Sequence, residues 1–353
     1  MLNNFFEVFQ IIKYPLIGLF LCFLLLSISW KNIFPIFGFK KYNNLQRVHF
    51  GEIPRLGGLI IYISLWIIWF TGLFDHQFFL FILLSSIPLM IVTVKEDLFH
   101  NTGAKLRLYS MILSCLLFFY FYPITFPMLD TPAFSSIINS SPFNYLFFIF
   151  SILVVTNGMN LIDGMNGLFS LTALSQLLFL FFIGSSVNDW LIVQTSLFFA
   201  IPLFVFLLFN FPSGRIFIGD FGAYFYGFVI SLLAIYTFGE YPELLTWLAV
   251  LVLSYPSIEL LFSFIRKKLN SKSPLEADDK HLHTLIYKKF FFKLGRHKLA
   301  NNITTLSLFI FWMGPLIFYT FTTVSLLTIF CSILLLTFIY VLLYILISKP
   351  DRK

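Results

Sequence analysis

Two amides and a carboxylate end an apolar segment near the middle of the chain. Residues 157–167 read NGMNLIDGMNG and directly follow the apolar run 145–156. Asn157, Asn160 and Asp163 are spaced by three, so on a helix they span an arc of about 120° and share one face. Capping of a helix end in the headgroup region is the simpler explanation, but it does not account for three such groups on one face. The stretch therefore indicates a polar site.

An acidic pair ends another apolar segment. Residues 94–108 read VKEDLFHNTGAKLRL, with Glu96 and Asp97 side by side. Adjacent side chains on a helix diverge by about 100°, so the two carboxylates need not share a role. An interfacial helix end would also explain the pair.

A glycine-rich turn follows a third apolar segment. Residues 210–227 read NFPSGRIFIGDFGAYFYG, in which Arg215 and Asp220 precede an apolar run. A glycine-rich helix start offers N–H groups and the positive end of the helix dipole, which suit phosphate oxygens. A capped helix start explains the glycines and Asp220, but it explains Arg215 less well.

Two histidines lie in a basic, polar segment, SPLEADDKHLHTLIYKK (273–289). His281 and His283 would diverge on a helix, whereas an extended backbone would put them on one side. A zinc site is disfavoured because no cysteine is near and no third ligand is obvious. Anchoring on anionic lipid remains the alternative explanation for the lysines.

These segments bring hard oxygen donors together with cationic side chains. Carboxylate and amide oxygens suit Mg²⁺, and also Mn²⁺, which take one or two protein ligands and complete their shells with phosphates. A reaction between a soluble phosphate compound and a lipid phosphate joins two anions. A metal ion and basic side chains would offset their repulsion before an oxygen attacks phosphorus.

The composition predicts that membrane-spanning helices position these groups. The 353 residues are 59% hydrophobic and 11% charged, whereas soluble domains carry about a quarter charged residues. We expect an all-α polytopic membrane protein with about eleven transmembrane helices, each needing roughly 20 apolar residues. The predicted spans are 11–30, 56–74, 78–95, 108–126, 143–160, 167–184, 190–209, 222–238, 242–262, 303–322 and 325–347.

The charge distribution predicts the orientation of these spans. With the N-terminus outside, all of the 23 Lys and Arg residues except Lys13 fall on one side of the membrane. The turns on the other side contain no Lys or Arg, but they contain Asp75, Asp130, Asp189, Glu240 and Glu243. The positive-inside rule therefore places the C-terminus and all the polar segments in the cytoplasm. The longest cytoplasmic segment is 263–302. The expected partner of the basic residues is the lipid bilayer, and no nucleic acid is expected.

At these segments the chain resembles the polyprenyl-phosphate N-acetylhexosamine-1-phosphate transferase superfamily, also called glycosyltransferase family 4, which includes the phospho-MurNAc-pentapeptide translocases. The resemblance is collinear from about residue 47 to 290. It is carried by HFGEIPRLGG (49–58), the acidic pair, NGMNLIDGMNG, FPSGRIFIGDFGAY (211–224) and DDKHLHTLIYKK (278–289). Departures include Glu-Asp where many members have Asp-Asp, Asn166 for a commoner Asp, and Glu259 where many members have Asp.

The resemblance implies roles for individual residues. Asp220 and Asn160 would bind Mg²⁺, or Mn²⁺, with Asp163 close by. Asp97, with Glu96, would orient or deprotonate the lipid phosphate, and Lys105 would lie near that phosphate. Phe217 would stack near the uracil. The remaining expected substrate-binding residues are Asn157, Asn166, Arg215, His281, His283 and Arg55.

The implied protein is a single membrane transferase domain over 1–353, with a cytoplasmic substrate-binding loop at 263–302. It would move an N-acetylhexosamine 1-phosphate from a UDP-sugar to undecaprenyl phosphate and release UMP. It would lie in a bacterial inner membrane and begin a surface polysaccharide or lipopolysaccharide O-antigen pathway. The resemblance allows a homodimer and leaves the sugar open. The alternative is a secondary transporter of a nucleotide sugar or a cation, whose site would show broken helices near the midplane.

Overall fold

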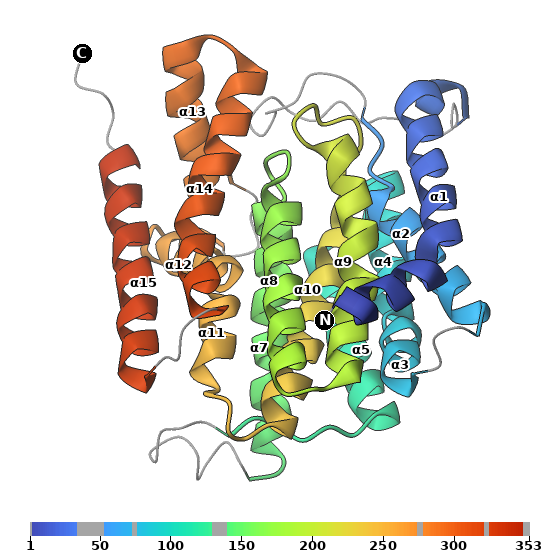
Figure 1. Cartoon of the computed structure of the whole chain (residues 1–353). Coiled ribbons are helices and arrows are strands. Elements are labelled where there is room, and N and C mark those ends of the chain that lie inside the picture. Colours follow the sequence, from blue (N-terminus) through green and yellow to red (C-terminus); the bar gives the residue numbers. More distant parts are fainter. Residues whose placement is uncertain are drawn as a thin grey trace.

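Helices make up all the regular secondary structure in the described part of the chain. The computed structural model describes residues 2–33, 53–72, 76–128, 140–273, 278–320 and 325–348. The helices are α1 (Leu2–Ile33), α2 (Gly57–Phe70), α3 (Gln77–Ser85), α4 (Ile87–Phe99), α5 (Ala104–Phe121), α7 (Phe143–Ile162), α8 (Leu168–Ser186), α9 (Trp190–Asn210), α10 (Gly219–Glu240), α11 (Trp247–Val252), α12 (Ser254–Leu269), α13 (Leu282–Leu294), α14 (His297–Thr320) and α15 (Leu326–Ser348). Most run side by side, and α13 lies at one end of the bundle (Figure 1).

The bundle is that of a multi-pass membrane protein. Seven of the described helices are long and apolar enough to cross a bilayer, namely α5, α7, α8, α9, α10, α14 and α15. The pair α3 and α4 counts as an eighth span if its 45° bend lies within the membrane. Two shorter apolar helices, Lys13–Ile28 within α1 and all of α2, complete the set.

This result differs in number from the eleven predicted spans. Each predicted segment is helical over most of its length. Seven or eight of the described helices, however, are long and apolar enough to cross a bilayer. Two segments are broken, at Ser86 between α3 and α4 and at Leu253 between α11 and α12. Pro88 and Pro256 lie in the first turns that follow these breaks. Proline has no N–H to donate to a preceding turn, so it begins a helix more readily than it continues one.

Helix α10 is the central element of the bundle, and nearly all its side chains are buried. It packs against α7, α4, α2 and α8. Glycine permits the closest of these crossings, because a Cβ added at Gly58 would lie 2.2 Å from the Cα of Gly222. A Cβ at Gly227 would lie 2.7 Å from the Cα of Thr156 on α7. The backbones of α2 and α7 therefore approach α10 more closely than side chains would allow.

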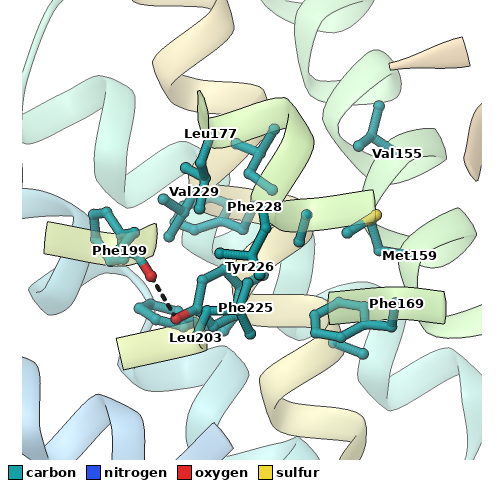
Figure 2. Packing of buried hydrophobic residues seen from close by; sticks show 14 of the residues in the cluster. Val155, Met159, Phe169, Leu177, Phe199, Leu203, Phe225, Tyr226, Phe228 and Val229 are labelled. Carbon is teal, nitrogen blue, oxygen red and sulfur yellow. Dashed lines mark hydrogen bonds between the residues drawn. The ribbon is translucent and has the colours of Figure 1, made fainter. Parts of the chain in front are cut away.

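Aromatic side chains fill the space around the middle of α10. Phe199 packs against Phe225 and Tyr226, and Phe169 packs against Tyr226 (Figure 2). The buried Tyr226 hydroxyl donates a hydrogen bond to the Phe199 carbonyl oxygen at 3.0 Å. Such a bond satisfies the polar atom that this packing removes from water. The core thereby fixes the position of α10 and of the polar turn at its start.

The two ends of the bundle differ in character. The Tyr241 hydroxyl, just after α10, donates to Asp189 Oδ2 at the start of α9 over 3.0 Å. The predicted outside acids Asp189 and Glu240 therefore lie at the same end of the bundle. Asp75, Asp130 and residues 49–52 of the HFGEIPRLGG segment lie outside the described residues. The start of α10 lies at the opposite end, where the polar motifs meet.

Candidate active site

A backbone pairing positions the start of α10. The N–H of Phe217 donates to Pro54 O at 2.8 Å, and Gly57 N–H donates back to Phe217 O at 3.0 Å. Gly219 then has φ +79°, and a Cβ there would lie 2.3 Å from Arg55 O and 2.7 Å from Asp97 Oδ2. Only glycine adopts this conformation without strain at such a close approach. The turn brings segment 54–58 and the end of α4 against the start of α10.

Asp97 caps α10 from a different helix. Its Oδ1 accepts the N–H of Asp220 at 2.8 Å, and its Oδ2 accepts the N–H of Phe221 at 3.0 Å. Both N–H groups belong to the first turn of α10, where no intrahelical acceptor exists. A buried carboxylate at this end of the helix also interacts favourably with the dipole. The structure thus brings Asp97 next to Asp220, and both oxygens of Asp97 are engaged in this cap.

Two arginines hold Asp220. Arg55 Nη2 donates to Asp220 Oδ1 at 2.9 Å, and Arg107 Nη1 donates to Asp220 Oδ2 at 2.6 Å. Arg55 Nε also lies 3.6 Å from Asp97 Oδ1. Two guanidinium groups that converge on one carboxylate form a receptor for an anionic oxygen group, because each presents N–H donors in a fixed fork.

Arg107 was not among the residues predicted for the site, whereas Lys105 was. The two residues lie two positions apart on α5, so their side chains point about 200° apart. Lys105 is exposed, whereas Arg107 is half-buried. The buried residues Ser110, Ser114 and Phe118 follow Arg107 at helical spacing. That pattern of small polar and apolar residues was the available signal.

Asn157 and Asn160 on α7, and Asp163 just after it, have different surroundings. The Asn160 amide nitrogen donates to the Tyr224 hydroxyl of α10 at 3.1 Å, while the Asn157 amide nitrogen donates back to Leu153 O at 2.8 Å. Asp163 follows the last residue of α7. Desolvation, opposed by Arg55 and reinforced by the carboxylates of Asp220 and Asp97, raises the pKa of Asp163 well above its ordinary value. Asn160 and Asp163 therefore face the acidic cluster, and Asn157 does not bond to it.

Asn166 lies in a packing junction. Its N–H donates to Asn301 Oδ1 at 3.1 Å, and its carbonyl oxygen accepts from Thr305 Oγ1 at 2.8 Å. Its side chain is buried against Gly214, where an added Cβ would lie 2.7 Å from the amide. Asn166 thus joins the α7–α8 turn to α14 and to the loop after α9. This supports the fold of the site from behind.

The other predicted residues lie around the cluster. Glu96 Oε2 accepts the N–H of Thr102 at 2.6 Å, which closes the turn between α4 and α5. In the loop before α10, Arg215 is exposed and Phe217 is half-buried.

The histidines come from the segment that leads into α13. The His281 and His283 rings are parallel within 4°, with centroids 5.6 Å apart, so the extended backbone at His281 does put them on one side. His283 packs against Gly164, the residue after Asp163, since a Cβ at Gly164 would lie 2.5 Å from His283 Nε2. Burial lowers the pKa of His283 to about 4, so the ring is neutral at pH 7.

The donor set suits a magnesium ion more than a transition metal. Among the described residues, no three His, Cys, Asp or Glu side chains form a metal-binding group. Mg²⁺ does not need such a cage, because it binds one or two carboxylates and completes its shell with water and phosphate. Asp220, Asp163 and Asn160 offer such oxygens, and a cation bound by Asp220 would share that carboxylate with Arg55 and Arg107. A cation there would also offset the mutual repulsion of the carboxylates.

A multi-pass helical bundle with a carboxylate, amide and arginine cluster at one end defines a class of membrane enzymes. A family model described as glycosyl transferase family 4 matches residues 79–238. The undecaprenyl-phosphate alpha-N-acetylglucosaminyl 1-phosphate transferase of Thermotoga maritima is 27% identical over 294 residues, 83% of this chain and 86% of that protein. A probable undecaprenyl-phosphate N-acetylglucosaminyl 1-phosphate transferase of Bacillus subtilis is 28% identical over 308 residues, 83% of this chain and 81% of that protein.

The phospho-N-acetylmuramoyl-pentapeptide-transferase of Dictyoglomus turgidum is 30% identical over 236 residues, 64% of this chain and 74% of that protein. The chain belongs to glycosyl transferase family 4, and it is an enzyme of the polyprenyl-phosphate N-acetylhexosamine-1-phosphate transferase family. The resemblance seen in the motifs is thus confirmed. The match to the family model covers the acidic cluster, while Arg55 and the two histidines lie outside it.

Proposed function

We propose that this enzyme transfers N-acetylglucosamine 1-phosphate from its UDP-sugar to undecaprenyl phosphate and releases UMP. An oxygen of the lipid phosphate attacks the sugar-bearing phosphorus, a new P–O–P bond forms, and the bond to UMP breaks with its electron pair leaving on UMP. The sugar follows the names of the Thermotoga and Bacillus relatives. The product would begin a cell-surface polysaccharide, such as an O-antigen.

The observation that carries the proposal is the arrangement around Asp220. Two guanidinium groups, a capped helix start and the carboxyl of Asp163 converge where two anionic phosphates would have to meet. Arg55 and Arg107 would bind phosphate oxygens, with Lys105 at the outer edge of the same side. Fixed cations at this point would lower the cost of bringing the anions together, which is the main demand of phosphoryl transfer.

The proposed cofactor is Mg²⁺, held by Asp220 and Asn160 with Asp163 close by. When bound, the ion would neutralise the diphosphate of the donor. The Asn160 nitrogen is engaged with Tyr224, which leaves the amide oxygen as the donor atom for the cation. Arg215, Phe217 and His283 are the proposed contacts of the uridine diphosphate sugar.

The proposed membrane arrangement has the site on the cytoplasmic face of a bacterial inner membrane. The short apolar helices and the broken pair α11 and α12 would complete about eleven crossings of one transferase domain. The N-terminus would lie outside and the C-terminus inside. Segment 263–302, which includes α13, would be the cytoplasmic part that covers the donor site. The clustering of the predicted inside residues at one end of the bundle supports this orientation.

The test is UMP release by the purified protein with undecaprenyl phosphate, Mg²⁺ and a panel of UDP-sugars, each with and without EDTA. We expect release with UDP-N-acetylglucosamine and loss of release with EDTA. Asp220→Asn should reduce the rate at least about 100-fold, because the amide removes the charge that the arginines and the metal require. Asp189→Asn, at the other end of the bundle, is the matched control. Uptake of a UDP-sugar into proteoliposomes without UMP release would favour a transporter instead.

A further inference from the structure

An alternating series of acidic and basic groups ties the histidine segment to α12. Glu259 Oε1 lies 2.9 Å from His281 Nδ1, and His281 Nε2 lies 3.4 Å from Asp278 Oδ1. Asp278 Oδ2 in turn accepts a hydrogen bond from Arg266 Nη1 at 2.8 Å. Glu259 and Arg266 both belong to α12, while the other two residues precede α13. The series therefore leaves α12, crosses the segment before α13, and returns to α12.

This series is buried at its inner end. Glu259 is 1% exposed and His281 is 8% exposed. A carboxylate so far from water requires a hydrogen-bonded partner, and removing that partner is costly. Arg266 is held in addition by Ser263 Oγ at 3.1 Å, and its guanidinium lies over the Tyr344 ring of α15, 5.8 Å from the centroid. The attachment thus involves the C-terminal helix as well as α12.

His281 has both ring nitrogens directed at carboxylate oxygens, so neither is directed at a substrate. His283 differs in this respect. Its Nδ1 is buried without a hydrogen-bond partner among the described residues, and its Nε2 lies beside Gly164, next to Asp163. The parallel stacking of the two rings couples the position of His283 to that of His281.

We propose that His281 is a positioning residue, which with Glu259 and Asp278 clamps segment 278–283 onto α12 so that His283 contacts the phosphate or sugar of the donor. The inference rests on the proposed function for the identity of the donor. It replaces the direct substrate contact that the sequence predicted for His281. The clamp itself is a property of the protein and can be measured without substrate.

Two measurements on the full-length protein in detergent test the clamp. The first is tryptic cleavage after Lys280, which is exposed between the clamped residues, followed by mass spectrometry. The second is the pair of KM values for UDP-N-acetylglucosamine and undecaprenyl phosphate. The variants are Glu259→Gln, Asp278→Asn, His281→Asn and His283→Asn.

The clamp variants should accelerate cleavage at least about fivefold and raise the donor KM about tenfold, with the KM for undecaprenyl phosphate unchanged. The double variant of Glu259→Gln with His281→Asn should be no worse than the more severe single variant, because both remove the same contact. His283→Asn should impair the reaction and leave cleavage unchanged. Asp279→Asn is the matched control, since Asp279 pairs with Lys288 of α13 and not with α12.

Other outcomes would overturn the inference. Multiplicative effects of Glu259→Gln and His281→Asn on the donor KM would mean that His281 contacts the donor directly. Unchanged cleavage in Asp278→Asn, whose site is only half-buried, would mean that no clamp exists. If the unmodified protein released no UMP with any UDP-sugar, the proposed function would fail. The cleavage pattern would still decide the clamp.

Discussion

Replacement of Arg107 by glutamine tests whether α5 contributes a phosphate-binding cation to the site. The change removes the guanidinium that bonds Asp220 Oδ2 at 2.6 Å and leaves a shorter, uncharged polar side chain. Arg55 still holds the other oxygen at 2.9 Å. Asp220 therefore loses one of its two cations and stays in a partly buried position.

The free energy lost on removing the Arg107 guanidinium should lie between two limits. Removing one partner of a buried ion pair costs about 3–5 kcal/mol, whereas an exposed pair is worth about 0–1 kcal/mol. The side chain of Arg107 is 22% exposed and that of Asp220 is 11% exposed, and Arg55 compensates in part. We therefore expect a loss of about 2 kcal/mol. If the guanidinium also binds the lipid phosphate in the transition state, that loss equals about 30-fold in kcat/KM.

The assay is UMP release at subsaturating undecaprenyl phosphate, together with the Tm of the purified protein. Lys105→Gln is the matched comparison, because it removes a cation two residues away on the same helix but at an exposed position. It should change kcat/KM less than fivefold, since exposed substitutions rarely exceed about 0.5 kcal/mol. A larger loss from Lys105→Gln than from Arg107→Gln would refute the assignment of the inward face of α5.

Three further predictions concern close packing and pH. Gly58→Val should lower the Tm and abolish UMP release, because the valine Cβ would lie 2.2 Å from Gly222 Cα. Gly314→Val is the control and should change neither the Tm nor UMP release, because a Cβ at Gly314 meets nothing within 4 Å. Gly164→Ala should raise the donor KM, measured by UMP release, because its Cβ would lie 2.5 Å from His283 Nε2. The pKa of His283 is lowered to about 4 by burial, below the unfolded value of about 6.5. Its neutral form therefore stabilises the fold above pH 6.5, and about 3 kcal/mol of that stability is lost as the pH falls to 4. His283→Asn should show a smaller fall in Tm between pH 7 and pH 4.5 than the unmodified protein.

The sequence predicted the helices well because each one is a long apolar run, and lipid requires such runs to satisfy their own backbone hydrogen bonds. It did not predict where two of these runs break. Pro88 and Pro256 were visible in the sequence, but proline occurs inside membrane helices as well as at their starts. Pro202, for example, lies within α9, which continues through it. Only the surrounding packing distinguishes the two cases.

The sequence predicted which residues lie near the site where the order and orientation of the spans alone determine it. Asp97, Asp163 and Asp220 each stand at the end of an apolar run, and the orientation of the spans put those ends on one side. The pairings within the site were not predictable. The bond from Arg107 to Asp220 joins residues 113 positions apart, and it depends on how α5 is rotated about its axis. The spacing of Ser110, Ser114 and Phe118 indicates the inward face of α5, but the partner of Arg107 on that face depends on the packing of α5 against α10.

Asp97 and Asp163 make different contacts, which bears on the role in proton transfer that the resemblance implied for Asp97 with Glu96. Asp97 accepts two N–H groups from the start of α10, so protonating it would weaken the cap that positions Asp220. A carboxylate bound in this way orients the start of α10. Desolvation and the nearby carboxylates raise the pKa of Asp163. A raised pKa makes a carboxyl group a stronger proton acceptor. If the lipid phosphate must lose a proton before it attacks, we propose Asp163 as the acceptor, because Asp97 is engaged in the cap of α10.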